Sequence, residues 1–386
     1  MATQEQQTKV FLMILNDISI SEYEKAIVDT DELPPEKIRP VVMGLYGEVG
    51  SIMATSKKLH REGGDVFTAF TREAREELGD TLWYLAALCR RLGISLESIV
   101  AEVISSHKLD KKIIAGSTAD SPIAEVRQFP SLASIDEVLV SLGQAASNLL
   151  TIELDDPDAK DRIVSFVASY LMAVQANKIS LAQIIKENVE KARGSFLKPT
   201  LERLPTFDED FPSEEKLPEN FEIEITQRAS GKSYLRMNGV YIGDPLTDNH
   251  RDKDGYRFHD VFHLAHAAVL HWSPVFRALI RHKRKSKAEI DEAEDSGRPI
   301  VIEEGLTAYV FSYAKDLNYF EGQGKISLGL LKTVRNFVRG YEVDVCPYKL
   351  WEDAILQGYD VFRQVRAKEG GTIVGDRKRR RLEFKG

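Results

Sequence analysis

Three acidic residues early in the chain have types and spacing that suit a cation site. Glu77 and Asp80 are three residues apart, so on a helix their carboxylates leave one face about one turn from each other. Glu48 lies on an earlier helical segment, where Lys57 and Lys58 follow it. Carboxylates held between helices repel one another unless a cation joins them, and oxygen ligands suit Mg²⁺ or Mn²⁺. The alternative is an acid pair on a solvated helix face.

A second group of chemically capable residues is a histidine stripe. The segment RFHDVFHLAHAAVLHW carries His259, His263 and His266 at positions i, i+4 and i+7, which lie on one helix face. Two imidazoles at this spacing suit Zn²⁺ or another transition metal when a third ligand comes from elsewhere. Glu303 or Glu304, in the downstream segment VIEEGLTAYVF, could supply that ligand. The alternatives are a buried polar cluster and a phosphate-binding surface.

Helical periodicity surrounds the acidic residues. From about residue 8 to 112, apolar residues recur every three or four positions, which predicts helices over 40–60 and 72–92. Gly93 is the expected stop of the second helix, and Ser95 is the expected N-cap of a third. The looser stretch 115–133 is predicted to be a linker.

The pattern then recurs after a capping box formed by Ser134 and Glu137. GQAASNLL (143–150) is similar to GEVGSIMA (47–54), and KISLAQIIKENVEKA (178–192) is similar to GISLESIVAEVISSH (93–107). We therefore interpret residues 1–112 and 134–198 as two copies of one helical unit that pack together as a pseudo-dimer. Chance similarity between amphipathic helices is the alternative.

The last part of the chain, residues 220–386, is predicted to be a helical domain with a small β element. The acidic, proline-containing stretch 205–224 reads as a second linker that leads into FEIEI. Asn238 and Gly239 are a hairpin signal, and the pattern is helical from Tyr256 to about Lys368. The tail GGTIVGDRKRRRLEFKG is expected to form a short hairpin or stay loose. The predicted fold class is mainly α.

The acid-bearing segments GLYGEVGSIMATSKKLHREG and EELGDTLWYLAALCRRLGISLESI resemble the MazG-type all-α nucleoside triphosphate pyrophosphohydrolases. The resemblance extends more faintly over the second predicted unit. It implies that Glu48, Glu77 and Asp80 bind the metal and act in catalysis, with Lys57 and Lys58 as candidate nucleotide contacts. The implied reaction is attack of a metal-activated water between the α- and β-phosphates, which gives a nucleoside monophosphate and pyrophosphate.

Each predicted unit departs from the family pattern in its own way. The first unit has Ser51 where the family has a fourth acid, and Val103 and Ser106 where it has nucleotide-contacting Asn and Lys. The second unit lacks the acids, with Gln144, Arg162 and Ser165 in their places, but it keeps Asn188 and Lys191. Two inferences stay open: one composite site with acids from the first unit and Asn188 and Lys191 from the second, or decay to a domain that binds nucleotide or only scaffolds.

The histidine domain admits more than one chemistry. HDVFH and EEGLTAY faintly resemble the zinc-binding segments of gluzincin peptidases, but Asp260 stands where that family has its catalytic Glu. A second phosphohydrolase centre is the other interpretation, because the basic run RALIRHKRKSK (277–287) could hold phosphate or nucleic acid. The alternative for that run is a solvated cationic helix face. The run RKRRR (377–381) reads as a solubilising tail.

Composition limits the class of protein. Hydrophobic residues make up 43% and charged residues 29%, which is typical of folded globular proteins. The net charge of −8 argues against a general nucleic-acid binder, and only two cysteines fit a reducing compartment. We expect a cytoplasmic homo-oligomer without membrane contact that hydrolyses an NTP or dNTP, in nucleotide-pool sanitation or antiviral defence. The alternative is a nucleotide sensor whose C-terminal His/Glu domain is a separate metal-dependent hydrolase.

Overall fold

The computed structural model describes residues 18–62, 67–106, 134–197, 199–201, 204–251 and 253–386. The chain divides into two compact units, Met1–Arg193 and Gly194–Gly386. The predicted segments 1–112 and 134–198 fall almost wholly in the first unit, and 220–386 falls in the second. The predicted linker 115–133 lies outside the described residues.

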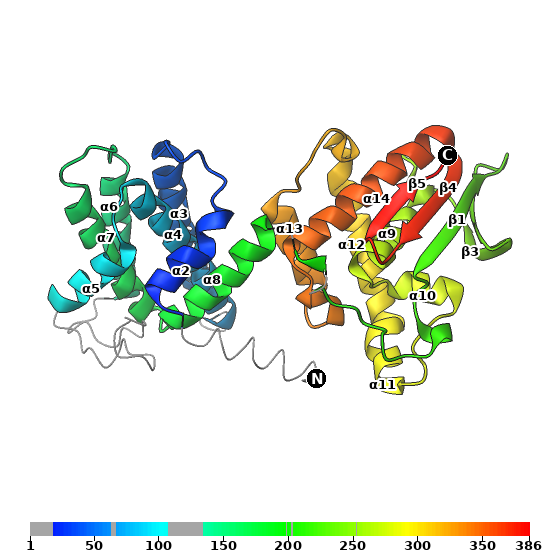
Figure 1. The fold of residues 1–386 in the computed structure, drawn as a ribbon, viewed down its shortest axis with the longest axis horizontal. Helices are drawn as coiled ribbons and strands as arrows, with labels where there is room; N and C mark the ends of the chain where they lie inside the picture. The colour runs from blue at the N-terminus through cyan, green and yellow to red at the C-terminus, as the bar shows by residue number, and fades with distance from the viewer. Residues whose placement is uncertain (1–17, 63–66, 107–133, 198, 202–203, 252) are drawn as a thin grey trace. The chain divides into compact units, whose positions relative to one another are not determined.

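The first unit is helical throughout its described part (Figure 1). Its helices are α2 (Ile20–Ile27), α3 (Arg39–Glu62), α4 (Phe67–Arg91), α5 (Leu96–Ser106), α6 (Ile135–Leu149), α7 (Ala159–Ala176) and α8 (Leu181–Phe196), with a 3₁₀ turn η1 at Val28–Thr30. The predicted capping box of Ser134 and Glu137 begins α6, and Ser19 with Glu22 forms a second box before α2. Gly93 follows α4 with φ +67°, as predicted for a left-handed stop.

One hydrophobic core joins the two predicted copies. Leu45, Leu78 and Leu85, from the first segment, are fully buried in the same cluster as Leu142 and Phe166 from the second. Neither segment therefore buries its apolar face alone in this unit. That the two segments are copies of one ancestral unit stays a prediction.

Two glycines allow helices of the first unit to approach closely. A Cβ on Gly44 of α3 would lie 2.3 Å from the ring of Tyr84 on α4. A Cβ on Gly79 of α4 would lie 3.1 Å from Cβ of Asn188 on α8. Gly44 and Gly79 thus serve packing close to the candidate acids Glu48 and Asp80.

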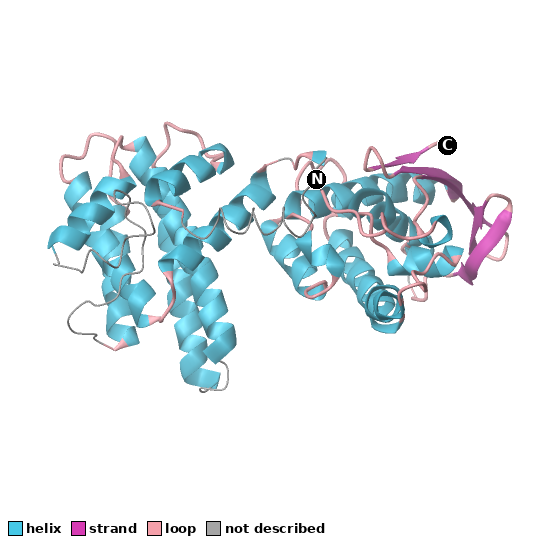
Figure 2. Ribbon diagram, turned by 60° about the horizontal axis from the view of Figure 1, so that its bottom comes forward, coloured by secondary structure: helices cyan, strands magenta, loops and turns pink. Residues whose placement is uncertain are grey.

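The second unit combines helices with one antiparallel sheet, whose strands are magenta in Figure 2. The strands are β1 (Asn220–Gln227), β2 (Ser233–Met237), β3 (Val240–Leu246), β4 (Gly370–Asp376) and β5 (Arg381–Phe384), in the order β3-β2-β1-β4-β5. Asn238 and Gly239 form the predicted turn with φ +50° and +80°. The tail forms a hairpin, β4–β5, which is one of the two predicted outcomes.

Helix α14 runs along β4 and β5 (Figure 1), and α9 and α10 also pack against strands of the sheet. They are α9 (Asp260–Ala265), α10 (Pro274–Ile280), α11 (Ala288–Ile290), α12 (Gly297–Lys315), α13 (Leu328–Phe337) and α14 (Tyr348–Lys368). The shorter turns are η5 (Ser213–Glu215), η6 (Tyr256–Phe258), η7 (His266–Leu270), η8 (Asp291–Asp295), η9 (Asn318–Phe320) and η10 (Glu342–Val345), of which η7 and η8 are π-helical. The predicted helix end at Lys368 is confirmed.

The predicted second linker and the two basic runs need correction. Asp208 of the acidic stretch is buried and accepts hydrogen bonds from Arg277 (2.7 Å) and Arg377 (2.9 Å), so this stretch is fixed to the second unit. Arg284 is equally buried and pairs with Asp295 at 2.7 Å. These two arginines of the run 277–287 are therefore neutralised inside the protein and cannot hold phosphate or nucleic acid, whereas Lys285 and Lys287 of the same run are exposed.

The C-terminal basic run is also structural rather than a tail. Arg380 is buried, and its guanidinium donates to the carbonyls of Val269 (2.6 Å) and Pro205 (2.8 Å). Arg377 donates to the carbonyl of Leu217 at 2.5 Å.

Among the described residues, no helix is long and apolar enough to cross a bilayer.

Candidate functional site

The three predicted acids meet at one place between α3 and α4, which lie side by side. Glu48 comes from α3, and Glu77 and Asp80 come from α4. One carboxylate oxygen of each lies within 4.8 Å of the others, and all three residues are half-buried. The i, i+3 spacing on α4 therefore brings its two carboxylates onto one face, as predicted. Three oxygens at this separation can share one hard cation.

Helix α8 brings the predicted Asn188 and Lys191 to the same acids. The Lys191 ammonium donates to Asp80 and, at 2.9 Å, to Oε1 of Glu76. The Asn188 amide Nδ2 donates to Oδ1 of Asp80 at 3.2 Å. Asn188 and Lys191 lie 108 and 111 positions after Asp80 in the sequence, yet the three side chains form one cluster. Each of the two predicted segments therefore contributes to it.

Tyr23 on α2 fixes the orientation of the Asn188 amide. Its hydroxyl donates to Oδ1 of Asn188 at 2.8 Å, and both residues are buried. Because Oδ1 is the amide's only acceptor atom, the Nδ2 donor is directed to Asp80. Gly79 keeps the backbone of α4 close enough for this contact. Asn188 is therefore held in place from two sides before any ligand binds.

The electrostatics of the cluster follow from crowding of like charges. Burial raises the pKa of Glu48 to about 8, and the neighbouring carboxylates of Glu77 and Asp80 contribute to the same rise. Burial alone would lower the pKa of Lys191, but the carboxylates of Asp80 and Glu76 outweigh it and raise that pKa. The cluster therefore holds more negative charge than Lys191 can neutralise alone.

Several predicted or pattern-matched positions lie elsewhere. Lys57 is exposed on α3, and the structure gives it no polar contact with the acids among the described residues; the side chain of Lys58 lies outside them. Val103, where the family pattern has Asn, is fully buried in the core. Sequence reasoning missed Glu76 and Tyr23. Their distance in sequence from Lys191 and Asn188 leaves no local signal for either contact.

The histidine stripe is organised around the buried carboxylate of Glu303. Its Oε1 lies 2.9 Å from Nδ1 of His266 and 3.1 Å from Nδ1 of His263. The Ser273 hydroxyl donates to both of its oxygens at 2.9 and 3.0 Å, and the Val275 N–H donates at 2.9 Å. Burial disfavours the charge of Glu303, but the nearby histidines lower its pKa to about 2. Ser273 and Val275 were not predicted.

Glu304 contacts the other end of the stripe. Its Oε2 lies 3.6 Å from Nε2 of His259 and 3.5 Å from Nε2 of His263. Burial would lower the pKa of His263, but the carboxylates of Glu303 and Glu304 raise it to about 10. The predicted ligand His266 is placed with Glu303 rather than with Glu304, and its ring packs against Trp351.

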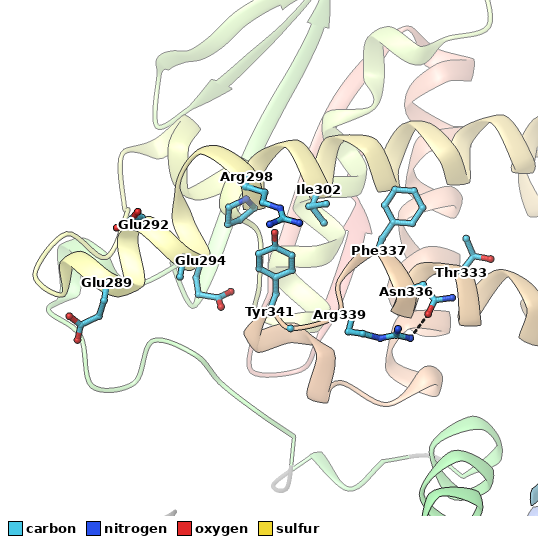
Figure 3. Close-up of a pocket in the computed structure, with 13 residues that line it drawn as sticks. Glu289, Glu292, Glu294, Arg298, Ile302, Thr333, Asn336, Phe337, Arg339 and Tyr341 are labelled. Carbon is cyan, nitrogen blue, oxygen red and sulfur yellow. Dashed lines mark hydrogen bonds between the residues drawn. The ribbon is translucent and has the colours of Figure 1, made fainter. Parts of the chain in front are cut away.

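A hollow of about 930 Å³ opens elsewhere on the second unit, between η8, α12 and α13 (Figure 3). Its lining mixes acidic and basic side chains, among them Glu294, Arg298 and Arg339. None of its lining residues belongs to the acidic cluster or to the histidine stripe. Its size alone therefore assigns it no role in either site.

The fold and the two clusters define a mainly helical protein with two candidate ion sites. Residues 202–386 match the family model described as MazG C-terminal domain. It is also 34% identical over 85 residues to the "Gene 37 protein" of Mycobacterium phage L5, a match that takes in 21% of this chain and 75% of that protein. No solved structure matches the chain.

The family model matches the half of the chain that the sequence patterns left unassigned. The predicted His/Glu domain, residues 220–386, lies within this match. The resemblance of the acid-bearing segments to MazG-type pyrophosphohydrolases stays a prediction, because that match begins at residue 202.

Proposed function

We propose that the chain is a metal-dependent nucleoside triphosphate pyrophosphohydrolase with one composite site in its first unit. The carboxylates of α3 and α4 supply the metal ligands, and α8 supplies Asn188 and Lys191. The observation that carries the proposal is the direct contact of both α8 residues with Asp80. The match of residues 202–386 to the MazG C-terminal domain model supports a MazG-type activity for the chain.

The donor set fits a hard divalent cation. Glu48, Glu77 and Asp80 offer oxygen atoms only, which favours Mg²⁺ or Mn²⁺ over softer metals. When bound, such an ion neutralises phosphate charge and lowers the pKa of an attacking water. The carboxylates hold this position from two helices, so its geometry depends on the close packing of α3 and α4.

Lys191 places a positive charge directly beside the acids, where the phosphates of a metal-bound nucleotide would lie. Its ammonium is held by Asp80 and Glu76, so it is oriented before a nucleotide binds. Asn188, directed by Tyr23, gives a neutral donor on the same side. Attack of water between the α- and β-phosphates would release a nucleoside monophosphate and pyrophosphate.

A nucleotide sensor without hydrolysis is the second candidate. The observation in its favour is Ser51, a half-buried hydroxyl on α3 one turn after Glu48, where the family pattern has a fourth acid. With three carboxylates, the site could bind a metal–nucleotide complex without activating water. Homo-oligomerisation and a role in pool sanitation or antiviral defence stay predictions.

Incubation with each NTP and dNTP plus Mg²⁺, followed by detection of pyrophosphate, separates the two candidates. The enzyme releases pyrophosphate and monophosphate in equal amounts from at least one nucleotide, and Asp80→Asn loses most of this activity. Asp161→Asn, at an exposed position on α7, is the matched control and keeps it. Nucleotide binding without pyrophosphate would favour the sensor, and no binding at all would refute both.

A further inference from the structure

One carboxylate oxygen of Glu304 faces a ring nitrogen of both His259 and His263 in the second unit. Oε2 of Glu304 lies 3.6 Å from Nε2 of His259 and 3.5 Å from Nε2 of His263. Ligand atoms about 2.0 to 2.2 Å from a tetrahedral ion are about 3.3 to 3.6 Å from one another. The separations to Glu304 are therefore those of ligands that share a metal ion.

The backbone fixes His259 in the tautomer that binds a metal. Its Nδ1 lies 2.8 Å from the carbonyl oxygen of Tyr256. Since a carbonyl only accepts, Nδ1 carries the hydrogen and Nε2 keeps its lone pair. The ring also stacks on Tyr256 at 4.3 Å between centroids. An outer hydrogen bond of this kind is the usual support of a metal-binding histidine.

His263 is a buried imidazole whose polar atoms lack ordinary partners. Its side chain is fully buried, and neither ring nitrogen makes a hydrogen bond of good geometry within the described part of the chain. Nδ1 faces the carboxylate of Glu303 and Nε2 faces that of Glu304. Buried polar groups are nearly always satisfied. An ion between Nε2 and Glu304 would satisfy that nitrogen, while Glu303 orients the ring from behind.

The site combines a buried wall with an open side. The imidazoles are buried, whereas the side chain of Glu304 is 41% exposed. Three protein ligands with access to solvent leave a coordination position for water, which is typical of catalytic rather than structural metal sites. The buried carboxylate of Asp260 lies within 4.8 Å of the ligand atoms of His259 and His263.

We propose that His259, His263 and Glu304 bind one divalent transition-metal ion, with Glu303 as the positioning residue for His263. Two imidazole nitrogens and one carboxylate favour Zn²⁺ or a similar ion over Mg²⁺. This site is separate from the all-oxygen site of the proposed pyrophosphohydrolase and does not depend on it. It gives the second unit a metal centre of its own.

The test loads the full chain with Co²⁺, whose visible spectrum distinguishes the two sites. A four-coordinate site with histidine nitrogens absorbs strongly, whereas a six-coordinate all-oxygen site absorbs weakly. The wild-type protein and Asp80→Asn both show one strongly absorbing Co²⁺ per chain, displaced by Zn²⁺. His259→Ala and His263→Ala lose that band. His250→Ala, at an exposed position, is the matched control and keeps it.

Two further variants test the metal site in case substitution of the buried histidines unfolds the protein. Glu304→Gln changes a half-exposed position and weakens Co²⁺ binding at least about tenfold with unchanged circular dichroism. Glu303→Gln weakens it about 10- to 100-fold through the orientation of His263. A folded wild-type protein that binds neither Co²⁺ nor Zn²⁺ overturns the proposal, and His263 is then an imidazolium between two carboxylates. Binding that survives both histidine substitutions also overturns it.

Discussion

Replacement of Lys191 by alanine distinguishes two hypotheses about the first unit most clearly: a composite nucleotide site and a domain that only scaffolds. The ammonium is only 14% exposed and contacts Asp80 and Glu76. In the composite site, its loss removes a charge-assisted hydrogen bond to phosphate, which is worth about 1.5 to 3 kcal/mol. At 1.4 kcal/mol for each factor of ten, nucleotide affinity falls by about 10- to 150-fold.

The same substitution has the opposite effect on the metal. Without Lys191, Asp80 and Glu76 lose a positive neighbour, so the carboxylate cluster becomes more negative. The affinity for Mn²⁺ without nucleotide therefore stays the same or rises. If Lys191 had only a structural role, its loss would unfold the site locally and weaken the binding of both nucleotide and Mn²⁺. Opposite changes in the two affinities would therefore not occur.

The assay combines two binding measurements on each variant. Calorimetric titration with an α,β-methylene nucleotide, which resists cleavage between those phosphates, reports nucleotide affinity in the presence of Mg²⁺. Electron paramagnetic resonance reports free Mn²⁺. Lys186→Ala on the same helix is the matched control and changes neither affinity. Wild-type nucleotide affinity in Lys191→Ala would refute the composite site and favour decay of the second segment.

Three further outcomes follow from named contacts. Asp80→Asn weakens Mn²⁺ binding at least about tenfold, because one ligand charge is lost. The helical circular dichroism stays unchanged, because the side-chain volume is kept. A variant that binds Mn²⁺ as tightly as the wild-type protein would show that Asp80 is not a metal ligand. Gly79→Ala places a Cβ 3.1 Å from Asn188 and therefore lowers nucleotide affinity. Gly50→Ala on α3, where a Cβ would have nothing within 4 Å, is neutral or raises the free energy of unfolding in urea by up to about 1 kcal/mol. Equal behaviour of the two variants would contradict the close approach of Gly79 to Asn188. Burial, with the nearby charges of Arg380 and Arg377, lowers the pKa of His271 to about 3, below its ordinary value of about 6.5. Its contribution to stability is therefore complete above pH 6.5 and is lost as the pH falls toward 3, by about 2 kcal/mol between pH 7 and 5. His271→Asn, which tolerates the φ of +60° at this position, reduces the stability difference between those pH values by about that amount, and an unchanged difference would contradict the assignment.

The sequence predicted helices, caps and turns more completely than it predicted contacts between distant residues, because helices, caps and turns depend on local signals. The capping box at Ser134, the stop at Gly93 and the turn at Asn238 each depend on a few adjacent residues, and the structure has all three. The acids on α4 meet because an i, i+3 spacing fixes their relative direction on any helix. The histidine stripe follows the same rule up to His266, where η7 changes the helical geometry.

The misread segments depend on partners that are distant in the chain. The basic run 277–287 has the composition of a cationic surface, but Arg277 pairs with Asp208, which lies 69 positions earlier. Arg377 pairs with the same Asp208 from 169 positions away. No local pattern distinguishes an arginine that has such a partner from one in solvent. The contact of Tyr23 with Asn188, 165 positions apart, was hidden for the same reason.

A double-mutant cycle on pyrophosphate release tests whether Asp80 and Lys191 act in one composite pyrophosphohydrolase site. The cycle compares the wild-type protein, Asp80→Asn, Lys191→Ala and the double variant with the best nucleotide and Mg²⁺. Residues that act as one unit are strongly non-additive. We expect each single variant to lose most of kcat/KM and the double variant to be no worse than the less active single variant. Fully additive losses, or a wild-type protein that releases no pyrophosphate from any nucleotide, would contradict it.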